Sequence, residues 1–405
     1  MSVVADTTGA DFPTLSREGV VYLDSAATSQ THRSVIAAMD DYYEHHRASV
    51  HRGVYPLAVE ATDLYEGARD RAAHWLGAHA RGTVFTKNAS EAVNLVSYSW
   101  GHANLGPGDT VVVTEMEHHS NFVPWQVLCE RTGARLAHVP VDDEGHLRLD
   151  VLDELLATGT VKLVAVVHVS NVLGTINPVQ DITARAHAAG AVVLVDGAQA
   201  VPQIPVDVAA IDADFYVWTA HKAYGPTGIG ILHGRPEILE AMPPFISGGH
   251  MIASVSLDGS RWADIPTKFE AGTSPIAEAA GLGAAVDYLQ GMGMDALRAH
   301  EQDLTGYALE RLRGVPGLTV NGPADAADRG ALVSFTLDCA HPHDVAEIVA
   351  RRGVCVRAGH HCAQPLMQRL GVAATTRASF GVHNTREDVD ALVDALGDVI
   401  TLFGD

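Results

Sequence analysis

Strand-like and helix-like segments alternate along the first two-thirds of this 405-residue chain. Short apolar runs predict strands, and the longer amphipathic stretches between them predict helices. The alternation is typical of a mostly parallel sheet with helices on both faces, in which ligands bind beyond the carboxyl ends of the strands. The predicted strands are Thr83–Thr86, Thr110–Thr114, Leu136–Val139, Leu163–Val169, Ala191–Asp196 and Phe215–Trp218, and predicted helices include Ala61–Leu76, Glu91–Trp100 and Ile182–Ala189.

The pattern changes after a helix-like stretch rich in small residues, Glu278–Gln290. We therefore expect an α/β fold in two parts, a large domain over residues 20–290 and a smaller α+β domain formed by residues 1–19 and 291–405. The elements expected in the smaller domain are a helix Asp295–Leu312, strands Leu332–Leu337 and Val354–Arg357, and a helix Arg386–Phe403.

Charge and hydropathy argue against nucleic-acid-binding and membrane-spanning proteins. The net charge is −22, from 49 acidic and 27 basic residues, which disfavours nucleic acid and anionic membranes as partners. No stretch approaches the roughly 20 unbroken apolar residues of a membrane span. The first residues, Met1 to Ser16, lack the basic-then-apolar pattern of a signal peptide, so we expect a cytoplasmic protein.

The cysteine pattern favours free thiols. None of the four cysteines forms a CxxC pair, and a cytoplasmic chain keeps its thiols reduced. A zinc site built from the adjacent histidine pairs and Cys362 is conceivable, but neighbouring side chains in an extended loop point to opposite sides, so we expect no metal. The cysteines are Cys129, Cys339, Cys355 and Cys362, and the histidine pairs are His118-His119 and His360-His361.

Lys222 follows the last predicted strand of the large domain, directly before a turn rich in glycine and proline. Most lysines in turns are simply exposed. A lysine at the edge of a core can instead be desolvated, which lowers the pKa of its ammonium group and makes the amine a nucleophile. The surrounding residues have to decide between these interpretations.

Several polar residues fall at the ends of other predicted strands. Asp196 ends an apolar strand, where it either caps a turn or pairs with a protonated pyridine nitrogen. Ser90 lies at a strand-to-helix turn as a candidate N-cap, and a helix N-terminus there would bind phosphate, aided by Thr219 and His221. His118, also after a strand, could stack on a flat cofactor and move protons near neutral pH.

Together these segments resemble the type I pyridoxal 5′-phosphate (PLP) enzymes of the class V aminotransferase group, and within it the SUF-type, or group II, cysteine desulfurases. The resemblance runs from about residue 20 to the C-terminus in the family's order, and it implies a type I PLP-transferase fold with a mostly parallel seven-stranded sheet. The segments that carry it are Tyr22–Ala27, Val50–Gly53, Met116–His119, His168–Gly174, Val195–Ala200, Thr219–Gly230, Phe269–Thr273, Arg357–Cys362 and Arg377–Ser379.

The resemblance implies a PLP site at the matching positions. Lys222 would hold the cofactor covalently, Asp196 would pair with its ring nitrogen, Gln199 with its ring hydroxyl, and His118 would stack on the ring. Ala89 departs from the family, whose members usually carry a hydroxyl or glycine residue there, so that only its backbone N–H is expected to contribute. The phosphate contacts implied are Ser90, Ala89, Thr219 and His221, with Thr273 from the other subunit of a homodimer.

The resemblance also implies a pocket for an amino-acid substrate. Arg377 and Asn171, the latter also beside the cofactor, would hold the substrate carboxylate, which suits the two-pronged guanidinium group. His51, Arg52 and Arg357 would line the same pocket.

Cys362 lies in a loop rich in glycine and histidine, Arg357-Ala-Gly-His-His-Cys362. Accessible cysteines near cationic groups are often nucleophiles, whereas buried cysteines act as small apolar residues. We interpret Cys129 and Cys339 as buried, and Cys355 as a structural residue in a strand. Cys362 is therefore the predicted catalytic thiol.

The function implied is the conversion of L-cysteine to L-alanine, with the sulfur kept as a persulfide on Cys362 and supplied to iron–sulfur cluster assembly. A selenocysteine lyase is an alternative, since selenium leaves more readily than sulfur. Another PLP-dependent lyase or aminotransferase shares the fold but needs no thiol at that place. A non-enzymatic scaffold in an iron–sulfur assembly complex is the alternative outside enzymes.

Only about 15 residues separate Cys362 from Arg377, so the cysteine loop is short. A short loop cannot carry sulfur far, and the acceptor must come to the cysteine. We therefore expect a sulfur-acceptor protein of the SUF system, SufE-like or SufU-like.

Overall fold

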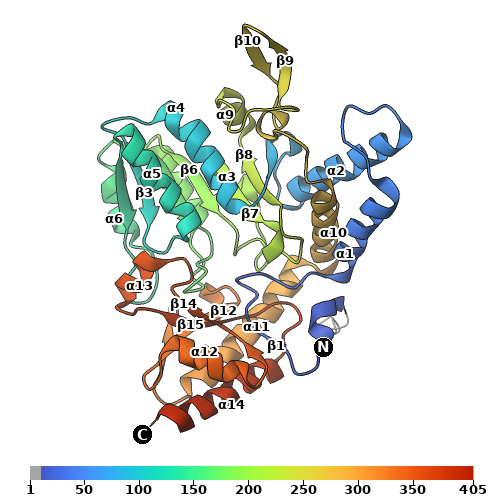
Figure 1. The fold of residues 1–405 in the computed structure, drawn as a ribbon. Coiled ribbons are helices and arrows are strands. Elements are labelled where there is room, and N and C mark those ends of the chain that lie inside the picture. The colour runs from blue at the N-terminus through green and yellow to red at the C-terminus, as the bar shows by residue number, and fades with distance from the viewer. Residues whose placement is uncertain (1–10, 405) are drawn as a thin grey trace.

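The computed structural model describes residues 11–404, in which two main sheets, each with its own helices, are stacked one above the other (Figure 1). A seven-stranded sheet forms the centre of the upper part, in the order β2-β8-β7-β6-β5-β3-β4. The strands from β7 to β4 are parallel, and only β8 runs antiparallel to its neighbours β2 and β7. Its strands are β2 (Thr83–Thr86), β3 (Thr110–Thr114), β4 (Arg135–Val139), β5 (Val161–Val167), β6 (Val192–Asp196), β7 (Phe215–Thr219) and β8 (Gly230–Gly234).

Alternate residues of these strands enter two separate cores, one on each face of the sheet. Val164 and Val193 lie in one core, and their strand neighbours Leu163 and Leu194 lie in the other. This follows from the period of two along a strand, and burial on both faces explains why the strands are apolar throughout. The helices of this part are α1 (Arg33–Asp41), α2 (Pro56–Trp75), α3 (Ala89–Val96), α4 (His102–Asn104), α5 (Val123–Thr132), α6 (Leu149–Leu156), α7 (Val179–Ala188), α8 (Val208–Ile211), α9 (Pro236–Ala241) and α10 (Ile276–Met292).

The lower part of the molecule is built on a four-stranded antiparallel sheet, in the order β11-β12-β15-β14 (Figure 1). Its apolar residues form a third core with the helices that flank it. The elements are α11 (Met294–Arg313), β11 (Leu318–Asn321), β12 (Leu332–Leu337), α12 (Pro342–Ala350), β13 (Val354–Cys355), β14 (Arg357–Gly359), α13 (Gln364–Leu370), β15 (Thr375–Ser379) and α14 (Arg386–Phe403).

The N-terminal segment joins this lower part. The short strand β1 (Val21–Tyr22) pairs in parallel with β13, and Asp24 bridges to Ser379. The lower part thus draws on both ends of the described chain, although the division at residues 20 and 290 stays a prediction and residues 1–10 lie outside the description. A two-stranded hairpin, β9 (Ile252–Ser256) and β10 (Gly259–Trp262), projects from the opposite end of the molecule (Figure 1).

The mixed α/β fold with a mostly parallel sheet is confirmed. Some predicted bounds are wrong. The strand expected to reach Val169 ends at Val167, the last residue in register with β6, and Val169 instead forms an isolated bridge with Ile176. The strand expected over Val354–Arg357 is two strands, of which β13 pairs with β1 and β14 with β15. No helix within residues 11–404 is long and apolar enough to cross a membrane.

Candidate active site

A cavity of about 310 Å³ lies beyond the carboxyl ends of β5, β6 and β7, where the two parts of the molecule meet. The upper part contributes strand ends and the first turn of α3, and the lower part contributes β14, β15 and the loop between β14 and α13. The predicted site residues that line it are Ala89, Ser90, His118, Asn171, Asp196, Gln199, Thr219, His221, Lys222, Arg357, Cys362 and Arg377.

Lys222 ends a short 3₁₀ turn that follows β7. The turn is held in place because the N–H of Ser29 donates to His221 O (2.9 Å) and the N–H of Tyr224 donates to Ser29 Oγ (2.7 Å). The protein around the amine lowers the pKa of Lys222 to about 8 through desolvation, which the nearby carboxylate of Asp196 opposes. About a tenth of the amine is therefore unprotonated at pH 7, far more than for an ordinary lysine, and this free amine is the form that a nucleophile requires.

Asp196 is the last residue of β6, and its side chain is buried at the cavity wall. One carboxylate oxygen accepts from the N–H of Ala198 (2.9 Å). Burial raises the pKa of Asp196, against the effects of that N–H and of the Lys222 ammonium. A buried carboxylate of this kind suits a cationic or N–H donor on a bound ligand. Gln199 lies one turn further on, with its Nε2 donating to Ala26 O (2.6 Å).

The start of α3 forms an anion-binding cradle. Ser90 and the backbone of Ala89 lie in the first turn of the helix, and Ser90 Oγ contacts Ser120 Oγ (2.5 Å). Opposite them, Thr219 Oγ1 is buried with no hydrogen-bond partner within residues 11–404. Free helix N–H groups and unsatisfied hydroxyls of this type are suited to a phosphate group.

The N-cap of this helix is Asn88 and not Ser90, which sequence reasoning had taken as the candidate. Asn88 has an extended backbone, and its Oδ1 accepts from the N–H of Glu91 (2.9 Å). The cap is thus one residue before Ala89, and Ser90 is left free to face the cavity.

His118 lines the cavity, with its Nδ1 accepting from the N–H of Ser120 (3.1 Å). The ring proton is therefore assigned to Nε2. Burial, reinforced by the positive charge of Lys222, lowers the pKa of His118 to about 3. The imidazole is neutral at physiological pH, so it can stack on a flat ring without bringing a charge into the cavity.

Arg377 lies at the opposite side of the cavity on β15. Its Nη1 donates to Asn171 O (2.7 Å) and its Nη2 lies 3.3 Å from Asp24 Oδ1. Its buried Nε finds no acceptor in the described part of the chain, which leaves a charged donor for a ligand. The amide nitrogen of Asn171 donates one of its two hydrogens to His361 O (2.7 Å) and keeps the other. Arg377 differs from Asn171 in bringing a positive charge to a bound carboxylate.

Asp24 is a site residue that sequence reasoning did not assign. Its carboxylate contacts both Arg377 and Arg357, the latter at 3.1 Å to Nη2. Two adjacent arginines repel each other, and the shared carboxylate orients them and compensates part of their charge. The only sequence signal was its place in the segment Tyr22–Ala27, because the partners are more than 300 residues away.

Cys362 lies in the loop of residues 360–363 between β14 and α13, with its residue exposed at the cavity mouth. His361 and Cys362 both have left-handed backbone conformations, with φ of 49° and 56°. The Cys362 N–H donates to His360 Nδ1 (3.2 Å), and Cys362 O accepts from the N–H of His119 (2.6 Å). The loop is thus short, as the sequence predicts, and held from two sides. Lys222, Arg357 and Arg377 are close enough for their charges to interact with the thiol.

The other cysteines differ in environment. Cys129 is buried in α5, as expected. Cys339 is only half-buried, so the prediction of a fully buried residue is wrong; it follows β12 in a turn and not in a core element. All four thiols are free, and among residues 11–404 no three His, Cys, Asp or Glu side chains are grouped so that they could hold a metal ion.

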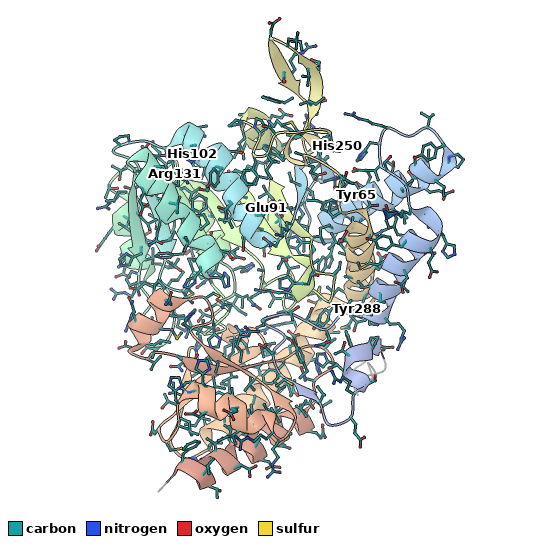
Figure 2. The ribbon with its side chains drawn as sticks, viewed as in Figure 1. Tyr65, Glu91, His102, Arg131, His250 and Tyr288 are labelled. Carbon is teal, nitrogen blue, oxygen red and sulfur yellow. The ribbon has the colours of Figure 1, made fainter. Side chains whose placement is uncertain are left out.

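Three expected site residues do not reach the cavity in a single chain. His51 and Arg52 are exposed ahead of α2, where the His51 ring stacks on His250 at 4.9 Å and lies edge-on to Tyr65. Figure 2 shows Tyr65 and His250 on the α2 side of the molecule. Thr273 lines a second cavity of about 240 Å³ beside Tyr65. Their roles stay predictions that require a second subunit.

Comparison with known proteins gives a consistent result. A family model described as aminotransferase class-V matches residues 21–392. The chain is 52% identical to a probable cysteine desulfurase of Streptomyces coelicolor, covering 97% of this chain and 96% of the relative. It is 49% identical to a cysteine desulfurase of Haloferax volcanii, covering 99% and 98%.

Solved structures agree with these sequence matches. The cysteine desulfurase of Thermococcus onnurineus superposes with a TM-score of 0.93 at 39% identity, covering 97% of each chain. The cysteine desulfurase CsdA of Escherichia coli, solved with an S-sulfonic acid, superposes with a TM-score of 0.91 at 38% identity, covering 97% of this chain and 98% of that one.

Proposed function

Because this chain belongs to the class V aminotransferase family, we propose that it is a PLP-dependent cysteine desulfurase that converts L-cysteine to L-alanine. The observation that carries the proposal is that a desolvated lysine, Lys222, and an accessible cysteine, Cys362, line one cavity together with Arg377. A cofactor-bearing lysine serves many reactions, whereas a thiol at the mouth of the same cavity favours sulfur removal over the reactions that need no thiol there.

The residues present fit PLP. Lys222 would attach it covalently, Asp196 would pair with the pyridine nitrogen and His118 would stack on the ring; all three side chains line the cavity. The first turn of α3 and the unpartnered Thr219 hydroxyl suit the phosphate group. When bound, PLP supplies an electron sink that the protein itself lacks.

Substrate binding depends on Arg377. Its unpartnered Nε can donate to the substrate carboxylate, while Asp24 and Asn171 O hold the rest of the guanidinium group in place. Arg357 adds positive charge at the same edge. The amino group of the substrate is thereby directed toward Lys222 and its sulfur toward Cys362.

Two groups handle the substrate's α-proton. Lys222, whose pKa is lowered to about 8, accepts the proton in its free-amine form, and the neutral His118, with a pKa of about 3, is the weaker base of the two. Cys362 Sγ, as the thiolate, then attacks the substrate sulfur. The new S–S bond forms as the substrate C–S bond breaks, which leaves a persulfide on Cys362 and alanine once the carbon is protonated.

The cellular role completes the proposal. The cysteine loop spans only residues 360–363, so a SUF-type acceptor protein, SufE-like or SufU-like, would approach Cys362 and carry sulfur to iron–sulfur cluster assembly in the cytoplasm. A homodimer would bring Thr273, His51 and Arg52 to the partner's cavity. Selenocysteine lyase activity is compatible with the same residues.

A combined assay tests the proposal. Purified enzyme with PLP should show a visible absorption band and release alanine from L-cysteine, and candidate acceptors should raise the rate. The Cys362→Ala variant should keep the band and lose at least about 100-fold in sulfur transfer, because it lacks the nucleophile. Cys339→Ala, which removes a half-buried thiol elsewhere, should retain full activity. Sulfide production by Cys362→Ala at the wild-type rate would exclude the proposed role, and a colourless protein that PLP cannot reconstitute would favour a scaffold.

A further inference from the structure

Glu117 is a fully buried carboxylate that the mechanism above does not use. It lies one residue before His118, after the end of β3. Its Oε1 accepts from Thr114 Oγ1 (2.7 Å) and from the N–H of Val167 (2.9 Å), and its Oε2 accepts from Asn121 Nδ2 (2.6 Å). Two of these partners, the N–H of Val167 and the amide nitrogen of Asn121, can only donate, so each oxygen of Glu117 must accept a hydrogen bond.

These three bonds join two strand ends to one turn. Thr114 is the last residue of β3, and Val167 is the last residue of β5 and the register partner of Asp196. Asn121 ends the 3₁₀ turn that begins at His119. Glu117 therefore fixes the turn to the edge of the sheet from which the cavity residues project.

The same turn contacts both reactive sides of the cavity. His118 precedes it and faces the cavity. The N–H of His119 donates to Cys362 O (2.6 Å), and His119 Nε2 accepts from the N–H of Gln364 (3.1 Å). A displacement of the turn would therefore move His118 and the cysteine loop together.

We propose that Glu117 is a positioning residue that holds His118 over the cavity and, through His119, the loop of Cys362. The effect of this role on catalysis rests on the proposed function, whereas the positions of His118 and Cys362 do not depend on that function. Burial raises the pKa of Glu117 to about 8, an effect that its hydrogen-bond donors oppose and that the nearby Asp196 increases. Burying an acidic group such as Glu117 reduces the stability of the fold, and the hydrogen bonds that it holds together are the physical reason for its presence there.

The direction of the hydrogen bonds makes the carboxylate necessary. Trp125 Nε1, which can only donate, bonds to Asn121 Oδ1 (3.1 Å). This fixes the amide of Asn121 with Nδ2 toward Glu117, so position 117 must accept. In Glu117→Gln the new amide nitrogen would face another donor, and rotating Asn121 would only move the conflict to Trp125.

A double variant that exchanges the carboxylate and the amide between positions 117 and 121 can restore the hydrogen bonds. In Glu117→Gln/Asn121→Asp, the new carboxylate at 121 accepts both from Trp125 Nε1 and from the amide at 117, while the amide oxygen still accepts from Thr114 and Val167. The turn is then held to the sheet edge again, with the carboxylate at position 121 instead of position 117. Glu130→Gln, on the exposed surface of α5, serves as the matched control.

The test measures geometry as well as turnover. In Glu117→Gln, we expect kcat for alanine formation to fall at least about tenfold with a smaller change in KM, as expected for misplaced reacting groups. The rate of Cys362 alkylation by iodoacetamide in the PLP-free protein should change at least about threefold, and the visible circular dichroism of bound PLP should weaken. The double variant should return all three readouts to within about threefold of wild type, and the control should leave them unchanged.

Alkylation of the PLP-free protein does not depend on the reaction, so it tests the positioning even if the desulfurase activity itself is absent. Wild-type alkylation and dichroism in a folded Glu117→Gln protein would overturn the proposal, as would a folded double variant that stays as impaired as the single one. If Glu117→Gln does not fold, Asn121→Ala removes the bond between Glu117 and the turn, together with the bond from Trp125 Nε1, and keeps both bonds from Glu117 to the strands. The same alkylation change is expected there, and its absence would also overturn the proposal.

Discussion

At the scale of single residues, the site depends on shifted proton affinities that arise from burial. Lys222, His118 and Asp196 each have their charged form disfavoured, and the charges of Lys222 and Asp196 compensate one another in part. Buried ionisable groups with shifted pKa values are typical of functional sites, because burying them reduces the stability of the fold.

The lowered pKa of Lys222 predicts a specific pH dependence for cofactor capture. Desolvation favours the free amine, so the amine becomes available as pH rises through about 8 and not through the usual lysine range. The rate of PLP incorporation into PLP-free protein, followed by absorbance, should rise with pH and level off above about 8. Lys222→Arg provides the blank without covalent attachment. A rate that still climbs steeply at pH 10 would contradict the desolvation.

At the scale of elements, the anion cradle depends on how closely α3 approaches the sheet. A Cβ added at Gly230, the first residue of β8, would lie 2.4 Å from Asn88 C and 2.8 Å from Ala89 N. Both are backbone atoms that cannot rotate away. Glycine here therefore allows the first turn of α3 to lie against the strand and face the cavity.

Gly230→Ala should therefore displace the start of α3. We expect a loss of stability of about 1–3 kcal/mol from overpacking. PLP affinity, measured by equilibrium titration of PLP-free protein, should weaken at least about tenfold if the phosphate binds at this turn. In Gly106→Ala the added Cβ has no described atom within 4 Å, and it should change neither quantity. Unchanged PLP affinity in Gly230→Ala would place the phosphate elsewhere.

At the scale of the whole molecule, the cavity exists only because distant parts of the chain meet. Asp24 from the N-terminal segment and Arg377 from β15 form one ion pair, and Asn171 bonds to the cysteine loop. Arg357, His361, Cys362 and Arg377 come from the lower part, and most of the other lining residues come from the upper part, so neither unit alone carries the complete lining. The alignment of Lys222 with Cys362 is therefore a property of the complete fold.

Exposed apolar residues at the start of α2 predict that two copies of the chain form a dimer. Val54 is 96% exposed, and Tyr55, Leu57 and Val59 are about half exposed beside it at the start of α2, near His51 and Arg52. Such a patch is typical of an interface between subunits. We expect a homodimer by sedimentation velocity, and Leu57→Glu should weaken the dimer at least about tenfold and reduce activity in parallel. Leu402→Glu, at an exposed position on α14, is the control. A wild-type enzyme that stays monomeric at high concentration would exclude this arrangement.

Much of the fold could be predicted because strand and helix patterns are local. The predicted strands Thr83–Thr86, Thr110–Thr114 and Leu332–Leu337 and the helix Arg386–Phe403 have the same bounds in the structure. The split of β13 from β14 could not be predicted, because it depends on which partner each short strand finds, and one partner lies in the N-terminal segment.

The sequence by itself determined the α/β architecture, because periodicity and strand ends are encoded locally, and through the family resemblance it predicted Lys222, Asp196 and Cys362 as reactive residues. Only the tertiary structure decided how these residues act on each other. The Asp24 bridge between two arginines, the desolvation of Lys222 and the Glu117 network all arise from contacts between segments far apart in the chain. Hydrogen-bond direction and burial are properties of such contacts, and a linear pattern does not contain them.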